Sequence, residues 1–153
     1  MVYQPSAFAC GVPRGPVVMS YRDPRVQEWE RRLKAVFDRI DGALERKYAG
    51  RYPLHPARPR QGETSSPEDD GLFDLGAAFS AGFGSEHGRG YSVQVRLATL
   101  HNVPDDVVQA IEEEVVTRLR EELPRAFPGR DLTVVAEGHA FKIVGDLGLD
   151  TAP

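Results

Sequence analysis

The sequence contains one cysteine, Cys10, among 153 residues, so no disulfide bond can form within a chain. No apolar run approaches the roughly 20 residues that a membrane-spanning helix needs. The first residues carry neither the basic nor the apolar segment of a secretory signal. We therefore expect a protein of the reducing cytoplasm, with no disulfide framework and no membrane partner.

Lysine is also scarce, and the charges are unevenly distributed along the chain. Residues 1–60 carry 12 basic and 6 acidic side chains, a net charge of +6, and residues 61–153 carry 7 and 17, a net charge of −10. Such asymmetry is typical of a basic arm for nucleic acid, or of two parts that attract each other within one chain or between subunits. We favour attraction and expect no nucleic-acid partner, because most basic residues alternate with acidic ones on a predicted helix.

The common motifs of metal and nucleophile chemistry are missing as well. There is no HExxH sequence, no CxxC pair and no G-x-S-x-G elbow. We therefore expect neither a metal site nor a bound cofactor.

Proline and glycine are frequent in two segments of the chain, residues 1–15 and residues 50–71. Residues 1–15 show no hydrophobic period and predict a flexible arm. The remaining residues, 16–153, have the length of one domain. Within that domain, four prolines in residues 50–71 disfavour helix and sheet, so we expect a flexible linker there.

Two segments have the apolar spacing of amphipathic helices. Asp23 and Pro24 are suited to start the first, which is expected to end near Tyr48. Pro104 lies in the first turn of the second, and Pro124 is expected to stop it. The predicted buried stripes are Val26, Trp29, Leu33, Val36, Phe37, Ile40 and Leu44, then Val108, Ile111, Val115 and Leu119.

Strands are indicated by alternating apolar residues. Residues 73–83 and 91–100 alternate clearly and predict an antiparallel hairpin. Residues 132–135 and 140–144 form a second hairpin, or one long strand bent at Gly138. Three aromatic side chains are assigned to the buried face of the first strand: Phe73, Phe79 and Phe83.

These elements predict an α+β fold, a two-layer sandwich of two amphipathic helices on one face of an antiparallel sheet of three to five strands. If residues 16–21 add a strand in front, the order becomes βαββαβ, which is ferredoxin-like. This architecture serves enzymes and binding proteins alike, so it leaves the function open.

The glycine-rich loop 82–90 is the strongest candidate site. Its glycines allow backbone amides to approach an anion, and the candidate ligand-binding residues are Gly84, Ser85 and Arg89. Glu86 and His87 in the same loop, with His139 in the second hairpin, are the candidate acid–base residues. The alternative interpretation is an ordinary hairpin tip.

Two functions follow from these observations. The first is a binding or assembly module without catalytic machinery, forming a homodimer in which a second copy covers a free sheet edge. The alternative is a small enzyme or anion-binding protein that uses the loop 82–90. Convergence of the two hairpin tips on one pocket would favour the alternative.

Overall fold

The computed structural model describes residues 23–148. The predicted arm 1–15 and the predicted strand 16–21 lie outside them. The chain divides into two units, Met1–Arg32 and Leu33–Pro153, and the boundary falls inside helix α2, Pro24–Lys47. In the first unit, Asp23 Oδ1 accepts the backbone N–H of Arg25 at 2.8 Å, which satisfies one of the free amides at the helix start.

Helix α3 in the second unit spans Asp105–Ala126, slightly longer than predicted. Pro124 lies inside the helix, so the expectation that it ends the helix was wrong. Proline in the last turn removes the one hydrogen bond that its N–H would give to the carbonyl of Arg120, and only two helical residues follow it. The helix then closes with the N–H of Phe127, which donates to the carbonyl of Leu123 at 2.8 Å.

The sheet of the second unit has four antiparallel strands in the order β1-β2-β4-β3. They are β1 (Phe73–Ser80), β2 (Gly90–Leu97), β3 (Leu132–Glu137) and β4 (Ala140–Gly145). Glu137 pairs with Ala140, and Gly138 in the turn between them has a φ of +64°. Residues 132–145 are therefore a hairpin joined by a tight turn, and not one bent strand.

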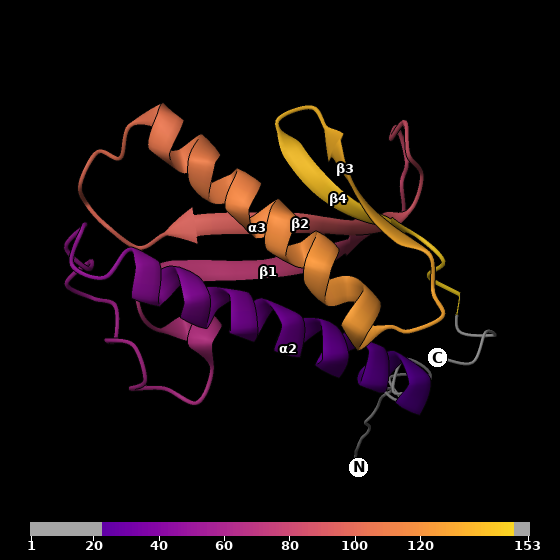
Figure 1. Cartoon of the computed structure of the whole chain (residues 1–153), viewed down its shortest axis with the longest axis horizontal. Helices are drawn as coiled ribbons and strands as arrows, with labels where there is room; N and C mark the ends of the chain where they lie inside the picture. Colours follow the sequence, from indigo (N-terminus) through magenta and orange to yellow (C-terminus); the bar gives the residue numbers. More distant parts are fainter. Residues whose placement is uncertain (1–22, 149–153) are drawn as a thin grey trace, which may run out of the picture. The chain divides into compact units, whose positions relative to one another are not determined.

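Figure 1 shows α3 and residues 33–47 of α2 lying on the same face of the sheet. Their apolar side chains meet those of alternate strand residues, and the resulting core confirms the α+β, two-layer prediction. The fully buried core side chains include Val36, Ile40, Leu44, Phe73, Leu75, Ile111, Val115, Leu119 and Ile143.

The assignment of Phe79 and Phe83 to the buried face was wrong. Phe73 is completely buried, whereas Phe79 is 58% exposed and Phe83 is 96% exposed. Strand β1 ends at Ser80, so Phe83 belongs to the following loop. Phe79 lies near the end of the strand and contacts Tyr91 edge to face, with ring centroids 5.6 Å apart.

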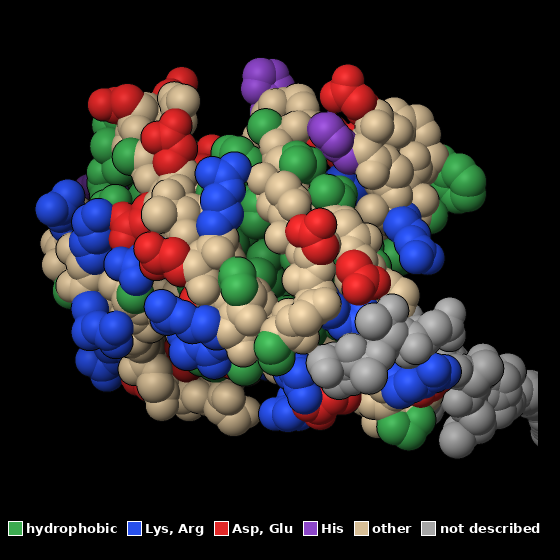
Figure 2. Space-filling model, turned by 45° about the vertical axis from the view of Figure 1, so that its right-hand side comes forward, with side chains coloured by type: hydrophobic (Ala, Val, Ile, Leu, Met, Phe, Trp, Pro, Cys, Tyr) green, Lys and Arg blue, Asp and Glu red, His purple; other side chains and the backbone are tan. Residues whose placement is uncertain are grey.

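Opposite charges join the helices of the second unit. Arg39 and Lys47 of α2 pair with Glu122 and Glu114 of α3, at 2.8 and 2.5 Å. These pairs agree with attraction between the basic and acidic parts of one chain. On the face that Figure 2 presents, basic and acidic side chains are correspondingly intermixed.

Residues 48–72 connect α2 to β1 and contain the short helix η2, Pro67–Asp69. The predicted flexibility of residues 50–71 and the predicted domain bounds stay predictions. Among the described residues, no helix is both long enough and apolar enough to cross a membrane.

Candidate functional site

Lys142 of β4 is buried on the sheet face opposite the helices. Its register partners are Ser92 and Val135, and its side chain is 2% exposed. Residues of the β1–β2 loop cover it: the ammonium group donates to Ser85 Oγ at 2.9 Å and to the carbonyl of Gly88 at 2.5 Å. Glu137 of β3 lies 3.4 Å from the same nitrogen.

Ser85 links the two hairpins, because its hydroxyl also hydrogen-bonds the Glu137 carboxylate. That bond, together with the Lys142 ammonium, holds the pKa of Glu137 below its usual value of 4.5, against the opposing effect of desolvation. The Lys142 ammonium group thus has two hydrogen-bond acceptors in the loop and the Glu137 carboxylate as an ionic partner on β3. Lys142 therefore anchors the loop over the sheet.

The loop 82–90 folds over the sheet face at Lys142 and brings several predicted site residues close to Glu137 of the second hairpin. Gly84 and Ser85 lie in the loop over Lys142, and the backbone N–H of His87 donates to Ser85 Oγ at 3.2 Å. His87 Nε2 lies 3.5 Å from Glu86 Oε1. Arg89 in this loop and His139 in the second hairpin turn are exposed. Their roles in binding or acid–base chemistry stay predictions.

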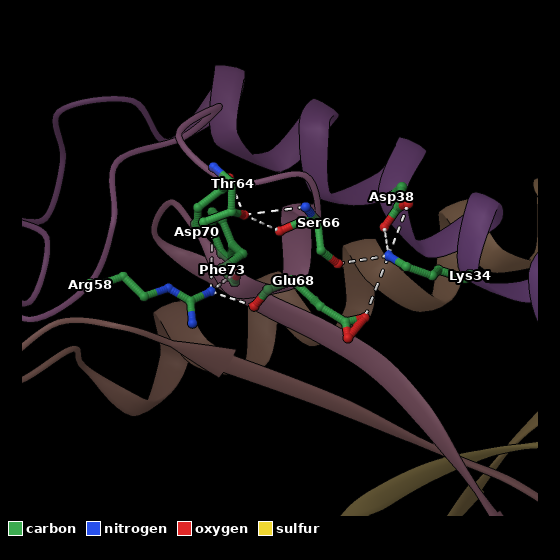
Figure 3. Close-up of polar contacts among 8 residues, drawn as sticks. All are labelled: Lys34, Asp38, Arg58, Thr64, Ser66, Glu68, Asp70 and Phe73. Atoms are coloured by element: carbon green, nitrogen blue, oxygen red, sulfur yellow. Dashed lines mark hydrogen bonds and ion pairs between the residues drawn. The ribbon is translucent and has the colours of Figure 1, made fainter.

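A second polar cluster surrounds Arg58 in the connection between α2 and β1 (Figure 3). Its Nη2 donates to the carbonyls of Glu68, Asp70 and Phe73 at 2.6 to 3.1 Å, and its Nε donates to that of Gly71 at 3.0 Å. One guanidinium group thus ties four backbone carbonyls together, because its donors fan out in a rigid plane.

Three buried carboxylates lie near this guanidinium group. Asp70 Oδ2 accepts hydrogen bonds from the backbone and hydroxyl of Thr64 and from the N–H of Gly62, at 2.8 to 3.2 Å. Glu45 accepts the N–H of Phe73 at 3.0 Å, and Asp41 is only 2% exposed. Among the described residues, no group of three or more His, Cys, Asp or Glu side chains has an arrangement that could hold a metal ion.

The sequence analysis selected neither Arg58 nor Lys142 as a site residue. Arg58 lies in the predicted linker, where its carbonyl partners come from residues 10 to 15 positions further along the chain. Lys142 carries a weak signal, since it is one of only three lysines and lies in the middle of a strand. Its burial depends on a loop more than 50 residues away, which no local pattern reveals.

At the outer edge of β1, the backbone groups of the first residue have partners, whereas those of the later outward-facing residues in the described part of the chain do not. The N–H of Phe73 donates to Glu45 and its carbonyl accepts from Arg58, so both point away from β2. Because this orientation repeats every second residue, the N–H and carbonyl groups of Leu75, Ala77 and Phe79 also point to the outer edge. Within residues 23–148 they have no hydrogen-bond partner there.

The opposite edge of the sheet, β3, differs in its middle. Arg120 of α3 donates from Nη2 to the outward carbonyl of Val134 at 3.1 Å. Arg120 therefore occupies a carbonyl in the middle of the β3 edge. On β1 the corresponding arginine, Arg58, occupies only the carbonyl of the first residue, Phe73. The longest open edge in the described part of the chain is Leu75–Phe79.

Comparison with known proteins gives a family for the chain. A protein of Borreliella burgdorferi with the description "Uncharacterized protein" is 33% identical over 121 residues, which cover 79% of this chain and 94% of the relative. No solved structure matches the chain. A family model with the description "Uncharacterised protein" matches residues 24–145, from the start of α2 to the end of β4, and the chain belongs to that family.

Proposed function

We propose that this protein is an assembly module that forms a homodimer by pairing its β1 strand with β1 of a second copy. The observation that carries the proposal is the outer edge of Leu75, Ala77 and Phe79, whose backbone groups have no partner within residues 23–148. An open strand edge is a template for another strand, because each unpaired N–H and carbonyl group can join a new ladder. A single cysteine in the chain fits the cytoplasmic location that we propose with this function.

A two-fold axis beside Ala77 would make the pairing self-complementary. In that antiparallel arrangement Ala77 faces Ala77 of the second copy, and Leu75 faces Phe79. All these residues turn their backbone groups outward, so each facing pair exchanges two hydrogen bonds. The interface would begin beyond Phe73, whose backbone groups Glu45 and Arg58 already occupy.

The side chains of this segment also suit a second copy. Residues 75–79 contain no charge and no proline, the two devices that commonly keep an edge strand from pairing. Phe79 exposes 58% of its surface on the helix-facing side of the sheet. Pairing would place its ring beside the apolar residues of the second copy and would remove part of that surface from water.

The test is the mass in solution of two matched proline variants, measured by light scattering and native mass spectrometry over a range of concentrations. Ala77→Pro removes an outward N–H from β1, and Ala136→Pro removes the corresponding N–H from β3. Proline is tolerated at such positions because neither N–H takes part in the sheet ladder. We expect twice the chain mass for the wild type and for Ala136→Pro, and a single chain for Ala77→Pro.

Thermal melts of both variants show whether the fold survives the substitution. A dimer with a dissociation constant of about 10 µM would be largely assembled at about 100 µM. A wild type that stays monomeric up to that concentration would refute the proposal. A folded Ala77→Pro variant that stays dimeric would show that a different surface makes the contact.

A further inference from the structure

A pocket of about 320 Å³ lies where the α2–β1 connection meets the end of β2. This volume is in the range of small-molecule sites in proteins. Three of its six lining residues are apolar and three are polar, and none of the six is acidic. The lining residues are His55, Ala57, Arg58, Leu97, Ala98 and Thr99.

Arg58 is held rigidly in the wall of this pocket. Its Nε and Nη2 atoms are bound to four backbone carbonyls, which fixes the plane of the guanidinium group. The remaining nitrogen, Nη1, has no hydrogen-bond partner within residues 23–148, and Figure 3 shows it pointing away from the bound carbonyls. Arg58 therefore offers two N–H donors that need no reorganisation to accept a ligand.

His55 is fixed in a similar way. Its backbone N–H donates to the carbonyl of Ala98 at 2.8 Å, which ties it to the end of β2. Its Nδ1 accepts the N–H of Ala57 at 3.0 Å, so Nδ1 carries no proton. The other nitrogen, Nε2, then carries the proton of the neutral ring and is a donor.

We propose that this pocket binds a small organic carboxylate with a compact apolar group. Arg58 and His55 supply fixed N–H donors for the carboxylate oxygens, and charge-assisted bonds of this type are stronger than neutral ones. Ala57, Leu97 and Ala98 supply apolar surface for the rest of the molecule. The site is separate from the β1 edge, and this proposal does not rest on dimer formation.

Benzoate is a suitable probe, with benzamide as a neutral molecule of the same shape and inorganic phosphate as an anion without an apolar group. Each is titrated into the full-length, ¹⁵N-labelled protein while backbone amide shifts are followed. We expect benzoate to shift the amides of Ala57, Ala98 and Thr99, with benzamide binding at least tenfold more weakly and phosphate causing no saturable shift. Equal binding of benzamide, saturable binding of phosphate, or benzoate shifts confined to other regions would overturn the proposal.

Two variants test the pocket without removing Arg58, whose loss would disturb the connection itself. Ala57→Leu fills the pocket, and Ala110→Leu adds the same side chain to an exposed position of α3 as its control. His55→Asn keeps an acceptor near the position of Nδ1 but removes the Nε2 donor. We expect at least fivefold weaker benzoate binding for Ala57→Leu and His55→Asn, and none of that loss for Ala110→Leu. Unchanged affinity in both pocket variants, with folded spectra, would place the ligand elsewhere.

Discussion

Asp41 lies one helical turn before Glu45 on α2, and both carboxylates are buried. One oxygen of Asp41 has no hydrogen-bond partner among the described residues. Burial raises the pKa of Asp41 from 3.8 to about 8, and the neighbouring Glu45 and Asp70 carboxylates add to the effect. Burial raises the pKa of Glu45 as well. Asp41 is therefore protonated in the folded protein at neutral pH.

This relationship predicts that Asp41→Asn stabilises the protein at alkaline pH. Between pH 4 and 8 only the folded state holds the Asp41 proton, so stability falls as the pH rises, by about 1.4 kcal/mol per pH unit. Asparagine carries no such proton, so the variant should show a flatter profile and its advantage should be complete above pH 8. Urea unfolding at several pH values measures the slope.

Asp38→Asn serves as the control for this experiment. Asp38 lies on the same helix but pairs with Lys34 at 3.1 Å and is partly exposed. Its substitution should leave the slope between pH 4 and 8 close to that of the wild type. An unchanged slope in Asp41→Asn would show that Asp41 is ionised in the folded state.

Gly71→Ala is expected to destabilise the protein more than Gly62→Ala. Both glycines have positive φ, +71° and +89°, so each alanine has a backbone cost of about 1 kcal/mol. At Gly71 the added methyl group would also collide with the Glu45 carboxylate, whereas at Gly62 it meets no atom within 4 Å. We expect at least twice the loss of unfolding free energy at Gly71, measured by chemical denaturation. Equal losses would mean that Glu45 moves aside freely.

Arg58→Lys should loosen the connection between α2 and β1. Lysine keeps the charge but cannot span four carbonyls in one plane, so we expect a loss of about 1 to 3 kcal/mol in the local opening free energy. Hydrogen exchange of the Gly62 and Thr64 amides, which donate to Asp70, reports that opening. Arg60→Lys, at an exposed neighbour, is the control. Exchange of both amides at the rate of an unfolded chain in the wild type would instead support the predicted flexible linker.

Ser85→Ala should make the stability of the protein depend less on pH in acid. The lowered pKa of Glu137 contributes stability above pH 4.5 that is lost as the pH falls through its folded-state pKa. Removing the Ser85 hydroxyl takes away the largest cause of that lowering, so the variant should be less stable than the wild type above pH 4.5 and should lose less stability as the pH falls. Melting curves from pH 3 to 6 test this. Ser92→Ala, which changes a serine on the same sheet face, should leave the profile unchanged.

The helices and strands could be predicted because their signals are local. The spacing of apolar residues and the start at Asp23 and Pro24 placed α2 within a residue of its observed bounds. The alternation of residues 73–83 predicted β1, but the same regular pattern continued past Ser80 and led to the wrong burial of Phe79 and Phe83. Alternation reports which side of a strand a residue faces, and not how far the covering layer extends.

The polar clusters could not be predicted in the same way. The sequence drew attention to the glycines around Ser85, but the partners of Ser85 lie more than 50 residues further along the chain. Arg58 lies in a proline-rich segment without any period, where the pattern of residues says nothing about which carbonyls come together. Such contacts depend on the path of a loop in three dimensions, and turn residues specify that path only locally.

The two edges of the sheet also limit how large an assembly can grow. If β1 of one molecule paired with β3 of the next, every added copy would offer a fresh edge and a filament would result. The guanidinium group of Arg120, on the carbonyl of Val134, obstructs the middle of β3. In the dimer that we propose, pairing of β1 with β1 would use the open edges of both molecules at once, so growth would stop at two copies. The hydrogen bond from Arg120 of α3 would then favour a closed dimer over an open-ended fibre.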